Sequence, residues 1–331
     1  MKNPNDEVLT PERIREIANA FQLSRVLLTA IELDIFSKLD KHLLSAEDLA
    51  AKINCNPKST ERLLNALVAI GFLRKIKNKF YNTDEAANYL VKGKPEFMGG
   101  LFHTNELWKS WSTLTEAVKV GKSVLQKDER SNDWTETFIA AMHHRALKES
   151  KILASMLNLE NINSLLDIGG GSGIYSMAFI EKNNNISATI LDLPNVIPLT
   201  KKYVDGFPLK QYIKFIEGDY LKADFGNNFD LIFLSAIVHI NSCEQNRMLI
   251  KKCYDSLNVG GQIIIKDWIM NNDKTEPLGG ALFSINMLVG TEFGDTYSEA
   301  EMKDWFLDCG ISKIERKSTS FGWNLLIGYK S

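Results

Sequence analysis

The chain has 331 residues, with 39 lysines and arginines against 41 aspartates and glutamates, so its formal net charge is -2. This length corresponds to about two domains, each able to bury a core. Composition is that of an ordinary globular protein, 44% hydrophobic and 24% charged. A near-zero charge gives no global field to attract nucleic acid or an anionic membrane. The longest apolar runs, about ten residues, are too short to span a bilayer. We therefore expect no nucleic-acid partner and no membrane association.

The cysteines and the N-terminus indicate the compartment. The four cysteines are scattered and form no C-x-x-C pair, which argues against a disulfide framework or a zinc cluster. The N-terminal sequence MKNPNDEVLT is polar and has no apolar signal-peptide core. We therefore expect a cytoplasmic protein without a metal site.

Residues 1–100 predict a helix-rich domain that ends in a small hairpin. Thr10-Pro11 begins a helix, because a cap residue precedes proline at the first helical position. A later helix follows Asn56-Pro57, and the segment FLRKIKNKFYNT then contains two short β-like runs around a turn. A helix that starts at Ser45 lies between these two, and three helices with a hairpin form the outline of a winged-helix domain.

Two functions are open for this winged helix. The basic run 74–79 in the hairpin would suit a DNA-binding regulator, which contacts phosphates with such a wing. However, the preceding helix alternates Lys58, Glu61 and Arg62, so it forms no strongly basic recognition face. The first helix is apolar on nearly every side, which indicates burial against another chain. We interpret the domain as a dimerisation module and expect a homodimer.

Residues 101–160 read as helical, with no strand pattern, and the pattern changes at residue 161. The apolar runs SLLDIG, ATILDL, IKFIEGD, DLIFLSAIVH and QIIIKDW then alternate with helical or polar segments. This alternation predicts a doubly wound parallel sheet with helices on both faces. The final segment, ISKIERKSTSFGWNLLIGYKS, predicts an antiparallel hairpin at the sheet edge. The expected fold class over residues 161–331 is therefore α/β and Rossmann-like.

The sharpest local motif is Asp167-Ile-Gly169-Gly-Gly171-Ser-Gly173, directly after the apolar strand SLL. Glycines at such a strand-to-helix turn let the backbone pass close to a ligand. A dinucleotide fingerprint would need a glycine where Ile174 stands, and no Lys-Ser/Thr follows as in a phosphate-binding loop. The spacing disfavours a nicotinamide-dependent oxidoreductase and favours a nucleoside that lacks phosphate.

Two further acids end the next two predicted strands. Asp192 lies 25 residues after Asp167 and can accept both hydroxyls of a ribose. Asp219, in EGDYL, can accept the amino group of an adenine, with Tyr220 beside the ring. Each acid alone could be a helix cap or a turn residue. Three acids at successive strand ends favour a nucleoside site.

A histidine and a carboxylate follow on the fourth and fifth predicted strands. His239 ends DLIFLSAIVH and Asp267 ends QIIIKD. These strands are expected to be neighbours, and ligands bind at the carboxyl ends of such sheets. A carboxylate beside an imidazole fixes its tautomer and stabilises its charged form. His239 is thus a candidate general base, with a purely structural histidine as the alternative.

With these motifs the chain resembles the class I S-adenosylmethionine-dependent methyltransferases. It resembles most the small-molecule O-methyltransferases that include the plant caffeate and animal hydroxyindole enzymes. The motifs are LLDIGGGSG, LDLPNV, GDYL, LSAIVHI and GGQIIIKDW. The resemblance implies a winged-helix dimerisation domain, a helical segment 101–160 that caps the substrate, and methyl transfer to a hydroxyl of a small aromatic or acidic molecule. S-adenosylhomocysteine would be the product. The resemblance assigns His239 as general base and Asp267 as its orienting acid, without a metal.

The resemblance also assigns ligand-binding positions. For the cofactor they are Asp167, Gly169, Gly171, Asp192, Leu193, Gly218, Asp219, Tyr220 and Ser235. For the substrate they are Phe138, Met142, Asn286 and Met287, with His103 and Trp108 as further candidates. Methionine and aromatic stripes at helical spacing are otherwise typical of a core. His143 and His144 are adjacent, so at most one of them points inward.

The chain departs from the plant members near these positions. An Ile-Asn pair follows His239 where they have Asp-Trp, and Ser235 stands where they have a lysine that reaches the cofactor. Their second catalytic acid falls on Thr296, and Glu292 or Asp295 is close enough in sequence to replace it. These departures leave a thiol or an amine open as the methyl acceptor.

Overall fold

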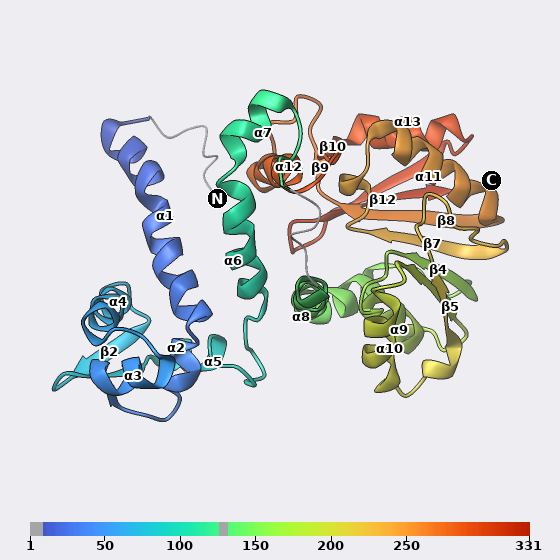
Figure 1. Cartoon of the computed structure of the whole chain (residues 1–331). Coiled ribbons are helices and arrows are strands. Elements are labelled where there is room, and N and C mark those ends of the chain that lie inside the picture. Colours follow the sequence, from blue (N-terminus) through green and yellow to red (C-terminus); the bar gives the residue numbers. More distant parts are fainter. Residues whose placement is uncertain (1–8, 126–131) are drawn as a thin grey trace. The chain divides into compact units, whose positions relative to one another are not determined.

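The structure, a computed structural model, describes residues 9–125 and 132–331 of the chain (Figure 1). It divides into two compact units, Met1–Glu106 and Leu107–Ser331. The three-part division expected from the sequence, at residues 100 and 160, stays a prediction. Within the two described ranges, no helix has both the length and the apolar character needed to cross a membrane.

The first unit combines helices with a small antiparallel sheet of strand order β1-β3-β2. Thr10 caps the first helix by accepting from the backbone N–H of Arg13 at 3.2 Å. Asn56 caps α4 by accepting from Ser59 N–H at 3.1 Å. Both predicted helix starts and the predicted hairpin are confirmed. The elements are α1 (Pro11–Glu32), α2 (Ile35–Lys38), β1 (Leu44–Ser45), α3 (Ala46–Ile53), α4 (Pro57–Ala69), β2 (Leu73–Ile76), β3 (Lys79–Asn82) and α5 (Asp84–Tyr89).

Helix α1 is buried only toward its C-terminal end. Leu28 and Ile31 lie in the core of the unit, whereas Ile14, Ile17 and Phe21 are 51%, 58% and 53% exposed. Large apolar side chains grouped on one exposed helix mark an interaction surface. The N-terminal half of α1 therefore lacks a covering partner within the described part of a single chain.

The second unit is built on a seven-stranded sheet of order β11-β12-β8-β7-β4-β5-β6. Strands β4 to β8 of this sheet pair in parallel, whereas β12 is antiparallel to both β8 and β11. The predicted α/β fold and its C-terminal hairpin are confirmed. The strands are β4 (Ser164–Ile168), β5 (Ser187–Asp192), β6 (Ile213–Glu217), β7 (Phe229–Ser235), β8 (Leu257–Asp267), β11 (Lys313–Lys317) and β12 (Asn324–Tyr329).

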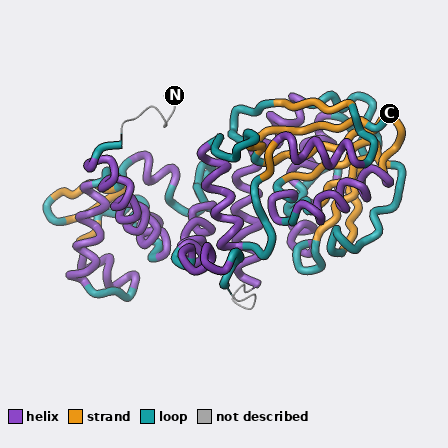
Figure 2. The backbone as a smooth tube through the Cα atoms, turned by 90° about the horizontal axis from the view of Figure 1, so that it is seen from above, coloured by secondary structure: helices purple, strands orange, loops and turns teal. Residues whose placement is uncertain are grey.

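Helices cover both faces of this sheet (Figures 1 and 2). Successive side chains of a strand point to opposite faces, so Phe233 belongs to the core under α8, α9 and α10, and Ile232 to the core under α11 and α13. A short parallel pair, β9 and β10, lies outside the main sheet. The remaining elements are α6 (Gly100–Trp111), α7 (Leu114–Val120), α8 (Asn132–Met156), α9 (Ile174–Lys182), α10 (Ile197–Asp205), η3 (Lys210–Tyr212), η4 (Val238–Ile240), α11 (Cys243–Ser256), β9 (Ile269–Met270), α12 (Leu278–Gly290), β10 (Tyr297–Ser298) and α13 (Glu299–Asp308).

The strand order places a crevice at the middle of the sheet. After β4, the chain adds β5 and β6 on one side, and then returns to place β7 and β8 on the other. In open α/β sheets, ligands bind outside the carboxyl ends of the strands at such a reversal. We therefore expect a ligand site at the residues that follow β4, β5, β6, β7 and β8.

The cap of α4 gives a test of the first unit. Asn56→Ala removes the oxygen that accepts from Ser59 N–H, and we expect the free energy of unfolding to fall by about 1 kcal/mol. Chemical denaturation followed by circular dichroism measures the change. Asn56→Asp, which keeps an acceptor, is the matched variant and should remain close to wild type. Equal losses in both variants would contradict the role of the cap.

Candidate functional site

The loop between β4 and α9 adopts left-handed backbone at glycine positions, among them Gly169 and Gly171. Gly169 and Gly171 have φ angles of 66° and 56°, a left-handed region that side chains with a Cβ rarely adopt. At Gly169 a Cβ would also collide with the side chain of Ile237. At Gly171 the space is more open, since a Cβ would meet only Ile139 Cδ1 at 3.6 Å. At Gly171 it is therefore the φ angle, and not the surrounding atoms, that favours glycine.

Asp192, at the end of β5, is hydrogen-bonded to this loop. Its Oδ2 accepts from Gly171 N–H at 2.8 Å, and its Oδ1 accepts from the N–H of Leu193 at 2.7 Å. Thr200 holds the same glycine from α10, donating from Oγ1 to its carbonyl at 2.6 Å. Burial raises the pKa of Asp192. A carboxylate has about four acceptor sites, so Asp192 keeps capacity for ligand hydroxyls.

Asp167 lies beneath the loop, not at its surface. Its side chain is 1% exposed, and Oδ2 accepts from Ser176 Oγ at 2.7 Å. A Cβ added to Gly170 would meet the Asp167 carboxyl at 3.0 Å, so the loop folds directly over the acid. Burial, with a contribution from the nearby Asp192 charge, raises the pKa of Asp167 to about 7. Its direct contact with a cofactor stays a prediction.

The third acid follows β6. Gly218 N–H donates to the carbonyl of Asp192 at 2.9 Å, which joins the ends of β5 and β6. Asp219 accepts from Leu221 N–H at 2.9 Å and pairs with Lys222 Nζ at 3.4 Å. The structure thus brings the predicted Gly218 and Asp219 beside Asp192 at one edge of the sheet.

His239 and Asp267 meet as the sequence predicts. His239 Nδ1 lies 2.9 and 2.8 Å from the two carboxylate oxygens of Asp267, and the residues are 7% and 1% exposed. Asp267 Oδ1 also accepts from Trp268 N–H at 2.8 Å, which fixes the carboxylate. Because the carboxylate faces Nδ1, that nitrogen carries the proton of the neutral ring. Nε2 is then the nitrogen that can accept a proton.

The secondary structure at His239 differs from the prediction. We expected it to end a strand, but β7 ends at Ser235 and His239 lies in the 3-10 turn η4. Ala236, between them, has a φ of 60° and donates the last ladder hydrogen bond, to Lys266 O at 2.9 Å. The left-handed residue turns the chain out of the sheet, so that His239 comes level with Asp267.

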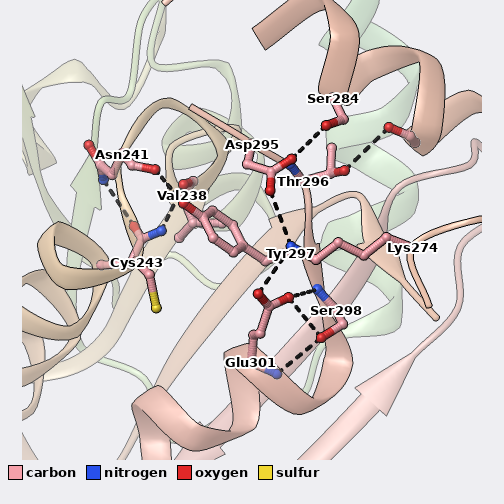
Figure 3. A network of polar contacts seen from close by, with 12 residues as sticks. Val238, Asn241, Cys243, Lys274, Ser284, Asp295, Thr296, Tyr297, Ser298 and Glu301 are labelled. Atoms are coloured by element: carbon pink, nitrogen blue, oxygen red, sulfur yellow. Dashed lines mark hydrogen bonds and ion pairs between the residues drawn. The ribbon is translucent and has the colours of Figure 1, made fainter. Parts of the chain in front are cut away.

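Hydrogen bonds to backbone carbonyls hold η4 and the residue after it from two sides (Figure 3). On one side, Asn246 of α11 donates from Nδ2 to Val238 O at 2.8 Å. On the other, Asp295 N–H donates to His239 O at 3.1 Å, and Tyr297 donates from its hydroxyl to Asn241 O at 2.6 Å. His239 therefore sits in a turn whose carbonyls are fixed by side chains and backbone from distant parts of the sequence.

Asn241 also connects this turn with the predicted cofactor residue Tyr220. Tyr220 donates from its hydroxyl to Asn241 Oδ1 at 2.8 Å, and Asn241 Nδ2 donates to Asn246 Oδ1 at 3.0 Å. In this chain asparagine replaces the second residue of the Asp-Trp pair that the plant enzymes have after the histidine. It forms a polar bridge between the β6 and β7 tips.

Of the positions considered for a second acid, Asp295 and Thr296 make contacts with α12 or the segment before it. The Asp295 carboxylate accepts from Ser284 Oγ at 2.5 Å and pairs with Lys274 Nζ at 3.1 Å (Figure 3). Thr296 is buried and donates from Oγ1 to Gly280 O at 3.4 Å, and Glu292 is exposed. These contacts tie α12 to the segment before β10. A role for Glu292 or Asp295 as second acid stays a prediction.

The predicted substrate residues fall on three helices. Phe138 and Met142 are half-buried on α8, and Met287 is buried on α12. Asn286 accepts from Trp111 Nε1 at 2.9 Å, which links α12 to α6. Trp108 lies on α6 in the second unit, whereas His103 belongs to the first unit. Their contact with a substrate stays a prediction.

The sequence reasoning missed several residues at the site. His143 holds the glycine loop, with Nδ1 2.9 Å from Ser172 Oγ and its ring stacked 4.3 Å from that of Tyr203. Burial, with a smaller effect of His144, lowers the pKa of His143. Phe283 and Trp323 surround His239, with ring centroids 4.8 and 5.9 Å away. In the sequence, the adjacent His143 and His144 gave a partial signal that one histidine points inward. No local pattern indicated Phe283 or Trp323.

The site chemistry fits a cationic nucleoside better than a phosphate. Carboxylates end β4, β5 and β6, and the loop residues 167–173 include no lysine or arginine. Carboxylates accept from sugar hydroxyls and amino groups and attract a positive charge, whereas they repel phosphate. Within the described residues, no group of three or more histidines, cysteines or acids could hold a metal ion.

The raised pKa of Asp167 gives a test by pH. Its folded value of about 7 exceeds the ordinary 3.8, so the folded protein holds a proton that the unfolded chain has released between these values. The free energy of unfolding should therefore fall as pH rises from about 4 to about 7. Asp167→Asn should lose this slope, as measured by urea denaturation at several pH values. The exposed Asp304→Asn controls for charge, and an unchanged slope in Asp167→Asn would contradict the assignment.

Comparison with known proteins agrees with this geometry. The chain is 29% identical over 312 residues to a 3-hydroxy-5-methyl-1-naphthoate 3-O-methyltransferase from Streptomyces sahachiroi, covering 92% of this chain and 90% of that protein. It is 26% identical to the tetracenomycin polyketide synthesis 8-O-methyl transferase TcmO from Streptomyces glaucescens, with 99% of each chain covered. A solved structure of PigF with SAH superimposes with a TM-score of 0.90 at 25% identity, covering 97% of this chain and 100% of that one.

Two family models match the chain. Residues 15–93 match the O-methyltransferase dimerisation domain, and residues 111–312 match the O-methyltransferase domain. The second match alone spans more than half of the chain and contains the glycine loop, the three strand-end acids and the His239–Asp267 pair. The chain belongs to the O-methyltransferase family, and it is an S-adenosylmethionine-dependent methyltransferase.

Proposed function

We propose that this protein methylates a hydroxyl group of a small aromatic molecule, with His239 as the general base. The observation that carries the proposal is the buried His239–Asp267 pair at the same sheet edge as the three carboxylates. A phenolic hydroxyl is a weak nucleophile while it keeps its proton, so a base is needed as the new bond forms. The related naphthoate and polyketide enzymes, which are named for O-methylation, support an aromatic hydroxyl as acceptor.

S-adenosylmethionine, when bound, supplies a methyl group on a sulfonium centre. We propose that Asp192 accepts from the ribose hydroxyls and Asp219 from the adenine amino group. The Gly171 backbone gives the ligand close access to the loop, as its open surroundings suggest. Asp167 and His143 act below and beside the loop, where their hydrogen bonds to Ser176 and Ser172 keep its shape.

At the acceptor, Nε2 of His239 takes the hydroxyl proton while Nδ1 stays hydrogen-bonded to Asp267. The carboxylate stabilises the imidazolium that forms and prevents the ring from rotating. Both groups are nearly inaccessible to water, so this electrostatic interaction is stronger than it would be at the surface. The turn η4, fixed by Asn246 and Asp295, holds the ring at a set position relative to the cofactor site.

The base assignment has a direct test. His239→Gln keeps a side chain of similar reach but cannot accept the proton, and we expect turnover to fall by roughly 10²–10⁴-fold. A panel of hydroxylated aromatics with radiolabelled S-adenosylmethionine measures the rate, and calorimetry with S-adenosylhomocysteine should give a nearly unchanged affinity. Asp267→Asn should lose part of the rate, and the exposed His42→Gln is the control. Wild-type turnover in His239→Gln would exclude His239 as the base.

We also propose that the protein is a homodimer formed through its first unit. The match to an O-methyltransferase dimerisation domain and the exposed apolar face of α1 support this. A single chain has a mass of 37.4 kDa, and size-exclusion chromatography with light scattering should give twice that value. Phe21→Glu in combination with Ile17→Glu places two charges on the face and should give monomers. The exposed Lys52→Glu is the control, and a dimer that survives the double change would place the interface elsewhere.

We also propose that the protein works in the cytoplasm, a reducing compartment. All four cysteines of the chain are free thiols in the structure, and disulfides are rare in reduced compartments.

A further inference from the structure

The indole N–H of Trp323 is a buried hydrogen-bond donor that has no partner among the described residues. Trp323 precedes β12 and is 5% exposed. Other indoles of the same unit are satisfied: Trp111 donates to Asn286 Oδ1 at 2.9 Å, and Trp305 donates to Cys243 Sγ at 3.4 Å. Buried polar groups in folded proteins almost always have a partner. An unused donor next to a catalytic pair suggests that a ligand supplies the acceptor.

Trp323 belongs to an aromatic cluster around the proposed base. Its ring centroid lies 5.9 Å from that of His239, 5.7 Å from Phe283 and 5.8 Å from Trp268. Phe283 meets His239 edge-on at 4.8 Å. His239 and Trp323 have nearly the same small exposure, 7% and 5%. Trp323 therefore packs directly beside the ring whose Nε2 is proposed to meet the acceptor.

Two cations lie over the same indole. Lys266 Nζ is 4.7 Å from the Trp323 ring centroid, and Arg145 Cζ is 4.9 Å from it. Both are held by Glu149, with Lys266 Nζ at 3.4 Å and Arg145 Nε at 3.5 Å from its carboxylate oxygens. A cation over an aromatic face is attracted to its electrons and draws them away from the N–H. This makes the indole a stronger donor, suited to an electron-rich oxygen.

We propose that Trp323 Nε1 donates a hydrogen bond to a second oxygen of the methyl acceptor, next to the hydroxyl whose proton His239 takes. The inference rests on the proposed function. The Trp323 and His239 ring centroids lie 5.9 Å apart, so one planar molecule with two adjacent oxygens can meet Nε2 of His239 with one oxygen and the Trp323 N–H with the other. The acceptor class is a planar aromatic molecule that carries a carbonyl or carboxylate oxygen adjacent to its hydroxyl.

Binding of two isomers tests this assignment. In 1-hydroxyanthraquinone a carbonyl oxygen lies beside the hydroxyl, and in 2-hydroxyanthraquinone it lies far from it. We expect wild-type protein saturated with S-adenosylhomocysteine to bind the first isomer more tightly, as followed by visible absorbance. Trp323→Phe keeps the ring under Lys266 and Arg145 but removes the N–H. It should weaken binding of the first isomer by roughly 5- to 10-fold and leave the second unchanged.

Trp305→Phe is the matched control, because it also removes a buried indole N–H but lies on α13. Unchanged thermal stability and cofactor affinity of Trp323→Phe show that the variant is folded. Equal weakening of both isomers, or no preference in the wild type, including failure to bind either, would overturn the inference. Methyl transfer is measured separately with simple phenols, so failure of the proposed function remains distinguishable from failure of this hydrogen bond.

Discussion

The parallel pairing of β7 with β8 sets the chemistry of this protein. Its register places Ser235 opposite Lys266, so the residues beyond each strand end emerge at the same level. The left-handed Ala236 then turns the chain out of the sheet, and the next residues bring an imidazole onto the carboxylate of Asp267. A shift of one residue in this register would point Asp267 to the opposite face of the sheet. The His239–Asp267 pair is thus a product of strand pairing.

Two buried carboxyl groups help to keep the shape of the glycine loop. Asp167 is under the loop and Asp192 is beside it, and both have raised pKa values because burial opposes ionisation. Backbone N–H groups and hydroxyls offset that effect, and the loop is the element that supplies them. The result is a turn held in a ligand-accepting shape by the same carboxylates that disfavour phosphate. His143 completes it from α8, a helix distant in sequence.

This chain differs from the plant enzymes at residues near the proposed position of the methyl acceptor. The position of the second acid in plant relatives is a buried threonine, and Asp295 beside it is tied to Ser284 and Lys274. Its backbone N–H, not its carboxylate, reaches the His239 turn. Near the His239 ring, Trp323 packs under Arg145 and Lys266, which Glu149 holds, so these contacts combine aromatic and cationic character. If His239 acts as proposed, specificity for the acceptor depends on these elements more than on the His239–Asp267 pair.

The sequence alone determined the α/β order, the helix caps at Thr10 and Asn56, the glycine turn and the acids that follow the strands. Each of these depends on local periodicity, turn geometry or strand-end position, which neighbouring residues specify. It also paired His239 with Asp267, because parallel strands bring their carboxyl ends together. Only the tertiary structure decided that η4 carries His239, that Asp167 lies beneath the loop, and that Trp323 packs against the His239 ring. Those outcomes depend on packing between residues far apart in the chain, which leaves no periodic signal in the sequence.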